Sequence, residues 1–124
     1  MLKKRILIVE DESILRDAYA IVLTSQGYEI STAANGLLAL DEIERQLPDL
    51  ILLDMLMPVM GGEQFLSESG ILSKHKSVKV IVYSNLSDRE SVERLLKRGV
   101  HEHIVKSSMS PIQLADYIKS ALVS

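Results

Sequence analysis

The chain has 124 residues, of which 47% are hydrophobic and 25% are charged, and its formal charge is −3 at neutral pH. These values are typical of one globular domain, and they argue against disorder and against nucleic-acid binding by this domain itself. Without cysteine there can be neither disulfides nor thiolate metal sites. The apolar run at 6–9 is too short for a signal peptide or a membrane span. We therefore expect a single cytoplasmic domain over residues 1–124, with no membrane contact.

Strand and helix patterns alternate along the chain. The expected strands cover residues 6–9, 28–33, 50–53, 78–83 and about 103–105. The expected helices cover about 14–26, 37–47, 62–72, 88–98 and 111–122. Such an alternation predicts an α/β fold in which a parallel sheet is covered by helices on both faces, with right-handed crossovers.

Capping signals mark three of the helix starts. Ser13 can cap the first helix, residues 87–90 have the S-x-x-E spacing of a capping box, and Ser110 with Pro111 precedes the last helix. Helical spacing places Ile14 and Ile21 on one apolar face of the first helix. It also directs Ile112, Ala115, Ile118 and Leu122 of the last helix inward.

Polar side chains follow the buried strand patterns. Glu10 and Asp11 follow the first, Asp54 the third, Ser84 the fourth and Lys106 the fifth. Because the carboxyl ends of parallel strands share one edge of the sheet, where α/β proteins bind ligands, we expect these side chains to lie together.

This set of residues suits phosphoryl transfer to a carboxylate. Asp11, Asp54 and also Glu10 offer the oxygen ligands that Mg²⁺ prefers. A carboxylate beside Mg²⁺ and a lysine can act as a nucleophile and form an aspartyl phosphate. Lys106 and the Ser84 hydroxyl are the right groups to bind the other phosphoryl oxygens. An ion pair with a capping serine would be the purely structural explanation.

Over essentially its full length, the chain resembles the receiver domain of bacterial two-component response regulators. The resemblance rests on the acidic pair Glu10–Asp11, the D-x-x-M-P run at 54–58, the hydroxyl of Ser84 and Lys106. It implies a flavodoxin-like three-layer sandwich, with a five-stranded parallel sheet of order 2-1-3-4-5 and five helices.

The resemblance also implies which residue is the phosphoacceptor and which residues bind the metal. Asp54 would accept a phosphoryl group from a partner histidine kinase or phosphotransfer protein. Mg²⁺ would be bound by Asp11, Asp54 and the backbone carbonyl of Met55, with Glu10 at or near the metal.

A switch is implied as well. Lys106 would pair with phosphorylated Asp54, and Ser84 would move to bond the phosphoryl group. The coupled aromatic position on the fifth strand falls on His103, which leads to the hypothesis of a pH-sensitive output surface; a surface histidine without a switch role is the alternative. The surface of the fourth helix, fifth strand and fifth helix is implied as the contact for an output protein or a homodimer.

Three residues depart from the family pattern. Ser107 replaces the proline that helps to aim the lysine, Gly61 replaces an aspartate, and Glu10 replaces the more frequent aspartate. None of these changes removes a group that the chemistry requires.

Two other functions remain as alternatives. A degenerate receiver would serve only as a protein-binding module. A phosphatase of the haloacid-dehalogenase kind would need a second aspartate two residues after Asp54, where Leu56 stands. We therefore expect a signalling domain that promotes only its own phosphorylation and dephosphorylation, and not an enzyme. The output could be a separate protein or a further domain.

Overall fold

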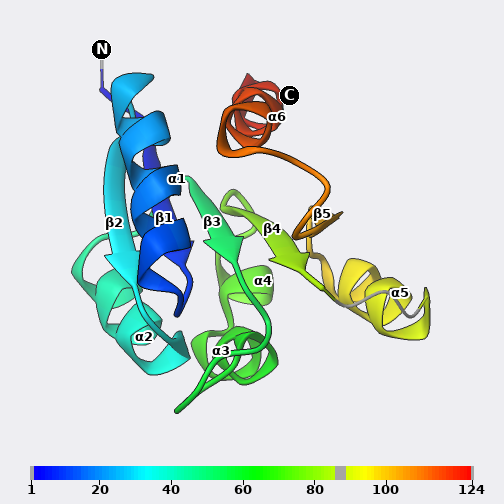
Figure 1. Cartoon of the computed structure of the whole chain (residues 1–124). Coiled ribbons are helices and arrows are strands. Elements are labelled where there is room, and N and C mark those ends of the chain that lie inside the picture. Colours follow the sequence, from blue (N-terminus) through cyan, green and yellow to red (C-terminus); the bar gives the residue numbers. More distant parts are fainter. Residues whose placement is uncertain (1, 86–88, 124) are drawn as a thin grey trace.

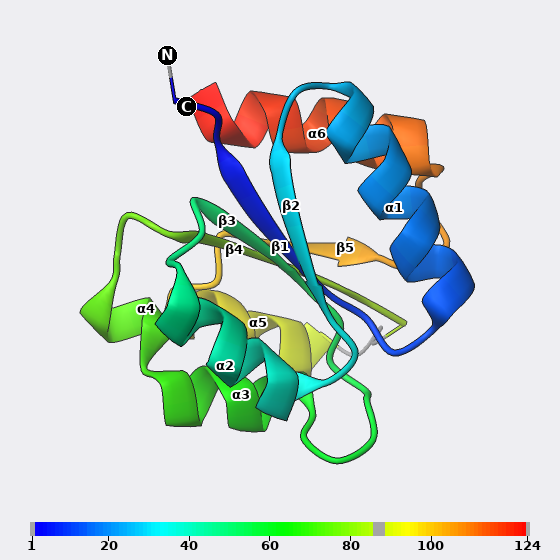
Figure 2. The same ribbon diagram turned by 90° about the vertical axis from the view of Figure 1, so that its left-hand side faces the viewer.

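The computed structural model describes residues 2–85 and 89–123 and has three layers (Figures 1 and 2). Its strands are β1 (Arg5–Val9), β2 (Glu29–Ala33), β3 (Leu50–Leu53), β4 (Lys79–Ser84) and β5 (Glu102–Val105). Its helices are α1 (Ser13–Ser25), α2 (Gly36–Arg45), α3 (Gly62–Ser69), α4 (Ile71–Lys74), α5 (Arg89–Arg98) and α6 (Pro111–Val123). The strands pair in parallel in the order β2-β1-β3-β4-β5, which confirms the predicted flavodoxin-like fold.

Helices cover both faces of the sheet. Figure 2 shows α1 and α6 on one face and α2 to α5 on the other. Alternate residues of the central strands face the two layers, so each face has its own buried apolar cluster. On β4, Val82 belongs to the cluster under α2 to α5, and Tyr83 belongs to the cluster under α1 and α6.

Six helices in the described residues replace the five that we expected. The predicted helix at 62–72 is divided at Gly70, whose φ of +62° ends α3 before α4 begins. Glycine adopts this left-handed conformation without the steric cost that a side chain would impose.

The inward face of one helix was predicted incorrectly, and that of another was predicted correctly only in part. Ile14 and Ile21 of α1 are 86% and 70% exposed, and the residues that α1 buries are Tyr19 and Leu23. Ile112 of α6 is also exposed, at 64%, whereas Ala115 and Ile118 of the same predicted face are buried as expected. The apolar residues of these helices extend around more than one face, so periodicity alone does not identify the buried one.

The cap predictions had different outcomes. Ser110 accepts a hydrogen bond from the Gln113 backbone at 3.2 Å and caps α6 as expected. Ser13 is instead the first residue of α1, because Glu12 occupies the cap position without a side-chain cap bond. The capping box at 87–90 includes residues outside the described ranges.

Candidate functional site

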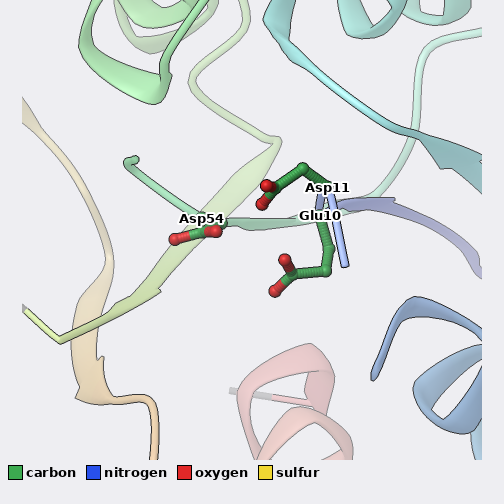
Figure 3. A group of neighbouring side chains, drawn as sticks. All are labelled: Glu10, Asp11 and Asp54. Carbon is green, nitrogen blue, oxygen red and sulfur yellow. The ribbon is translucent and has the colours of Figure 1, made fainter. Parts of the chain in front are cut away.

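Three carboxylates lie together at the carboxyl ends of β1 and β3. Oxygen atoms of Glu10, Asp11 and Asp54 lie within 4.8 Å of one another. Figure 3 shows the carboxyl groups of Glu10 and Asp11 both directed to the side on which Asp54 lies. Parallel pairing of Val9 with Leu53 brings the two strand ends level. The predicted acidic cluster is therefore present in the structure.

Lys106 provides the positive charge in this cluster. Its Nζ lies 3.1 Å from Asp54 Oδ2, 3.0 Å from Glu10 Oε1 and 3.4 Å from Glu12 Oε1. The Lys106 backbone N–H donates to the Ser84 carbonyl at 2.9 Å, which fixes the start of the side chain beside the end of β4. Lysine is thus directed at the carboxylates although Ser107 replaces the usual proline.

Burial and neighbouring groups shift the pKa values of the side chains in this cluster. Asp54 is 3% exposed, and burial, followed by the negative charge of Glu10, raises the pKa of Asp54 to about 6. Burial opposes ionisation of Glu10 as well, but hydrogen bonds from Tyr83, the Glu12 backbone and Lys106 outweigh it and lower the pKa of Glu10. Hydrogen bonds to Glu10 and Asp54 likewise outweigh burial and raise the pKa of Lys106.

The Met55 carbonyl lies where α3 begins. Its oxygen accepts the Gly62 N–H at 3.0 Å. A Cβ atom at Gly62 would lie 2.7 Å from the Asp54 carbonyl oxygen, and one at Gly61 would lie 2.9 Å from the Met55 carbonyl oxygen. The glycine pair therefore lets α3 begin against the segment that follows Asp54. The Cβ atom of an aspartate in place of Gly61 would have to be accommodated beside the Met55 carbonyl oxygen.

Ser84 and His103 lie side by side on the face of the sheet that α5 covers. The Ser84 hydroxyl is 3.1 Å from Nε2 of His103, and Ser84 itself is 1% exposed. Burial lowers the pKa of His103, although the charge of Glu102 acts in the opposite direction. The predicted hydroxyl and the histidine on β5 are therefore in contact.

Two residues of this cluster were not predicted. Glu12 contacts Lys106, and the hydroxyl of Tyr83 donates a hydrogen bond to Glu10 Oε1. Glu12 is the third residue of the acidic run after β1, and Tyr83 precedes Ser84 at the end of β4. A tyrosine in a buried strand needs a hydrogen-bond partner for its hydroxyl. This requirement could have indicated from the sequence that Tyr83 contacts a polar group.

Comparisons with known proteins find similar sequences and structures. The sequence model of the response regulator receiver domain matches residues 6–119. The chain is 32% identical to sporulation initiation phosphotransferase F of Bacillus subtilis over 86% of this chain and 84% of that protein. It is 31% identical to the phosphate regulon transcriptional regulatory protein PhoB of Escherichia coli over 96% of this chain but only 52% of that protein. The chain therefore spans about half the length of PhoB.

A solved structure is similar over nearly the whole chain. It is a CheY-like response regulator receiver domain protein from Methanospirillum hungatei, which aligns with a TM-score of 0.87 and 30% identity. The alignment covers 98% of this chain and 95% of that one. In the described part of this chain, no helix has the length and apolarity required to cross a membrane.

Proposed function

The chain belongs to the receiver-domain family of response regulators, and from this premise we propose that it accepts a phosphoryl group on Asp54 in a Mg²⁺-dependent reaction. The donor is a partner histidine kinase or phosphotransfer protein, and phosphorylation switches a protein-interaction surface. The observation that carries this proposal is the position of the buried Asp54 carboxylate, 3.1 Å from Lys106 and beside Glu10 and Asp11.

The donor set fits Mg²⁺. Three carboxylates close together repel one another in the absence of a cation. Burial, followed by the negative charge of Glu10, raises the pKa of Asp54. Asp11, Asp54 and the Met55 carbonyl would hold the ion, with Glu10 at or near the metal. When bound, Mg²⁺ would supply positive charge for the phosphoryl oxygens.

The chain's own residues have distinct roles in this proposal. An Asp54 carboxylate oxygen attacks the phosphorus atom as the bond to the donor breaks. Lys106 pairs with the transferred group and neutralises part of its charge, and the Ser84 hydroxyl bonds one of its oxygens. Movement of Ser84 changes its contact with His103 and so affects the surface formed by α5, β5 and α6, which are the fourth helix, fifth strand and fifth helix of the sequence prediction.

The degenerate binding module is less well supported than phosphorylation. A module that only binds proteins would not need a partly buried lysine shared between two buried carboxylates. We propose that the domain promotes only its own phosphorylation and dephosphorylation, and does not turn over an external substrate.

Intact-protein mass spectrometry tests the proposal. The parent, Asp54→Ala and Asp41→Ala are incubated with acetyl phosphate, with and without Mg²⁺. Asp41 is an exposed carboxylate on α2 and serves as the matched control. We expect a Mg²⁺-dependent mass gain of one phosphoryl group on the parent and on Asp41→Ala, and none on Asp54→Ala. No gain on the parent under conditions where Mg²⁺ binds would favour the degenerate module.

A further inference from the structure

Tyr83 connects the β4 core to the acidic cluster. Its side chain is 1% exposed, and its hydroxyl donates to Oε1 of Glu10, a residue 73 positions earlier in the chain. The Tyr19 ring meets the Tyr83 ring edge-on, with the ring centroids 5.4 Å apart and the planes at 83°. Packing therefore fixes the direction in which the phenol hydroxyl points.

Glu10 depends on a small number of donors. Glu10 is 0% exposed, so water does not compensate for a missing partner. Its Oε2 accepts the Glu12 N–H at 3.0 Å. Within residues 2–85 and 89–123, its Oε1 has two donors, the Tyr83 hydroxyl and the Lys106 ammonium at 3.0 Å. Tyr83 and Lys106 thus serve the same oxygen atom.

Lys106 is shared between Glu10 and the phosphoacceptor. Its Nζ lies almost equally far from the two carboxylates, at 3.0 Å from Glu10 and 3.1 Å from Asp54, and 5.4 Å from the centre of the Tyr83 ring. A phosphoryl group on Asp54 would draw the ammonium away from Glu10, and Glu10 Oε1 would lose one donor. A buried carboxylate oxygen without a donor is strongly destabilising.

We propose that Tyr83 is a positioning residue for the phosphoryl-transfer site, where its hydroxyl keeps Glu10 hydrogen-bonded so that Lys106 can leave Glu10 for the phosphoryl group. The inference rests on the proposed function of Asp54. It assigns Tyr83 an effect on Lys106 that is transmitted through Glu10, without contact between Tyr83 and the reacting atoms.

A double-mutant cycle on the unliganded protein tests the pairing itself. Tyr83→Phe is made alone and together with Lys106→Met, and urea unfolding is measured for each. Because Glu10 Oε1 loses both donors only in the double variant, we expect Tyr83→Phe to lower the unfolding midpoint more in the Lys106→Met background than in the parent. Equal shifts in the two backgrounds would overturn the proposal.

A second cycle tests the consequence for phosphoryl binding. Beryllofluoride is a phosphoryl mimic, and its binding at saturating Mg²⁺ can be followed by fluorine NMR. We expect Tyr83→Phe to weaken this binding about tenfold, and by less than about twofold when Glu10→Gln is also present. Glu10→Gln removes the carboxylate that requires the second donor. Tyr28→Phe is the matched control, because Tyr28 immediately precedes β2 and lies away from the acidic cluster. This variant should leave beryllofluoride binding unchanged.

The outcomes separate this inference from the proposed function. A general packing role for Tyr83 would weaken binding equally with Glu10 and with Gln at position 10, and that result would overturn the inference alone. Absence of Mg²⁺-dependent beryllofluoride binding by the parent would overturn both the proposed function and this inference.

Discussion

The hydroxyl of Ser84 and the Nε2 atom of His103 lie 3.1 Å apart, across the neighbouring strands β4 and β5. A neutral imidazole nitrogen can accept a hydrogen bond from the hydroxyl, whereas a protonated ring can only donate. The tautomer and the charge of His103 together therefore determine the direction of this hydrogen bond. A protonated His103 would donate to the Ser84 oxygen and could no longer accept the Ser84 hydroxyl proton.

His103→Phe should change the pH dependence of stability. Burial lowers the pKa of His103 in the folded chain, so the unfolded chain binds the proton at a higher pH. The contribution of the neutral ring is present above the ordinary histidine pKa of about 6.5 and is lost as the pH falls below it. We expect the free energy of unfolding of the parent, relative to His103→Phe, to decrease between neutral and mildly acidic pH in urea titrations.

The same variant tests the hypothesis of a pH-sensitive output surface. Once a partner is known, its affinity for the phosphorylated parent and for His103→Phe can be measured over this pH range. An identical pH dependence would assign His103 no switch role.

Asp54→Asn should stabilise the protein at neutral pH in the absence of Mg²⁺. The pKa of Asp54 is raised to about 6, so the carboxyl group favours folding while it is protonated and loses that contribution as the pH rises through about 6. Asparagine has no charge to bury. We expect a gain of about 1–3 kcal/mol in the free energy of unfolding above neutral pH, which disappears below the ordinary aspartate pKa of about 3.9. Asp41→Asn should show no such gain.

Mg²⁺ should stabilise the parent more than it stabilises Asp54→Asn. A ligand that binds only the folded state stabilises it by an amount that grows with the logarithm of its affinity, and Asp54 is one of the proposed metal ligands. We expect Mg²⁺ to raise the melting temperature of the parent more than that of Asp54→Asn. Equal shifts would show that Asp54 does not contribute to metal binding.

The strand ends were predictable because they are local features of the sequence. Continuous apolar runs such as 50–53 indicate buried strands, and the polar residue after each run occupies the functional edge of a parallel sheet. The buried face of α1 could not be identified in this way, because apolar side chains lie on several of its faces. Whether Ile14 or Tyr19 is buried depends on how the helix packs on the sheet.

The sequence predicted which residues form the site better than it predicted which of them contact one another. The bond from Tyr83 to Glu10 joins residues 73 positions apart and depends on the alternation of side chains along β4. The aim of Lys106 depends on the backbone bond to Ser84 and on the turn after β5, where Ser108 N–H donates to Val105 at 2.9 Å. Neither contact follows from residue type and spacing.

Lys106→Met should destabilise the protein at neutral pH. The methionine keeps an unbranched apolar side chain but leaves the buried carboxylates Glu10 and Asp54 without their shared cation. We expect a loss of about 3 kcal/mol in the free energy of unfolding near neutral pH, which becomes smaller below pH of about 6 as Asp54 takes up a proton. Lys97→Met, on the exposed surface of α5, is the matched control and should change stability by less than about 0.5 kcal/mol.

Val59→Gly should stabilise the protein. Val59 lies in the segment between Asp54 and α3 with a φ of +69°, a conformation that a β-branched residue adopts only with strain, and its side chain is 75% exposed. Glycine relieves the strain without loss of burial, although it increases the conformational entropy of the unfolded chain. We expect a net gain of about 1 kcal/mol in the free energy of unfolding, measured by urea denaturation. Val59→Ala retains a Cβ atom and should recover only part of this gain, and a Val59→Gly protein less stable than the parent would show that the conformation is not strained.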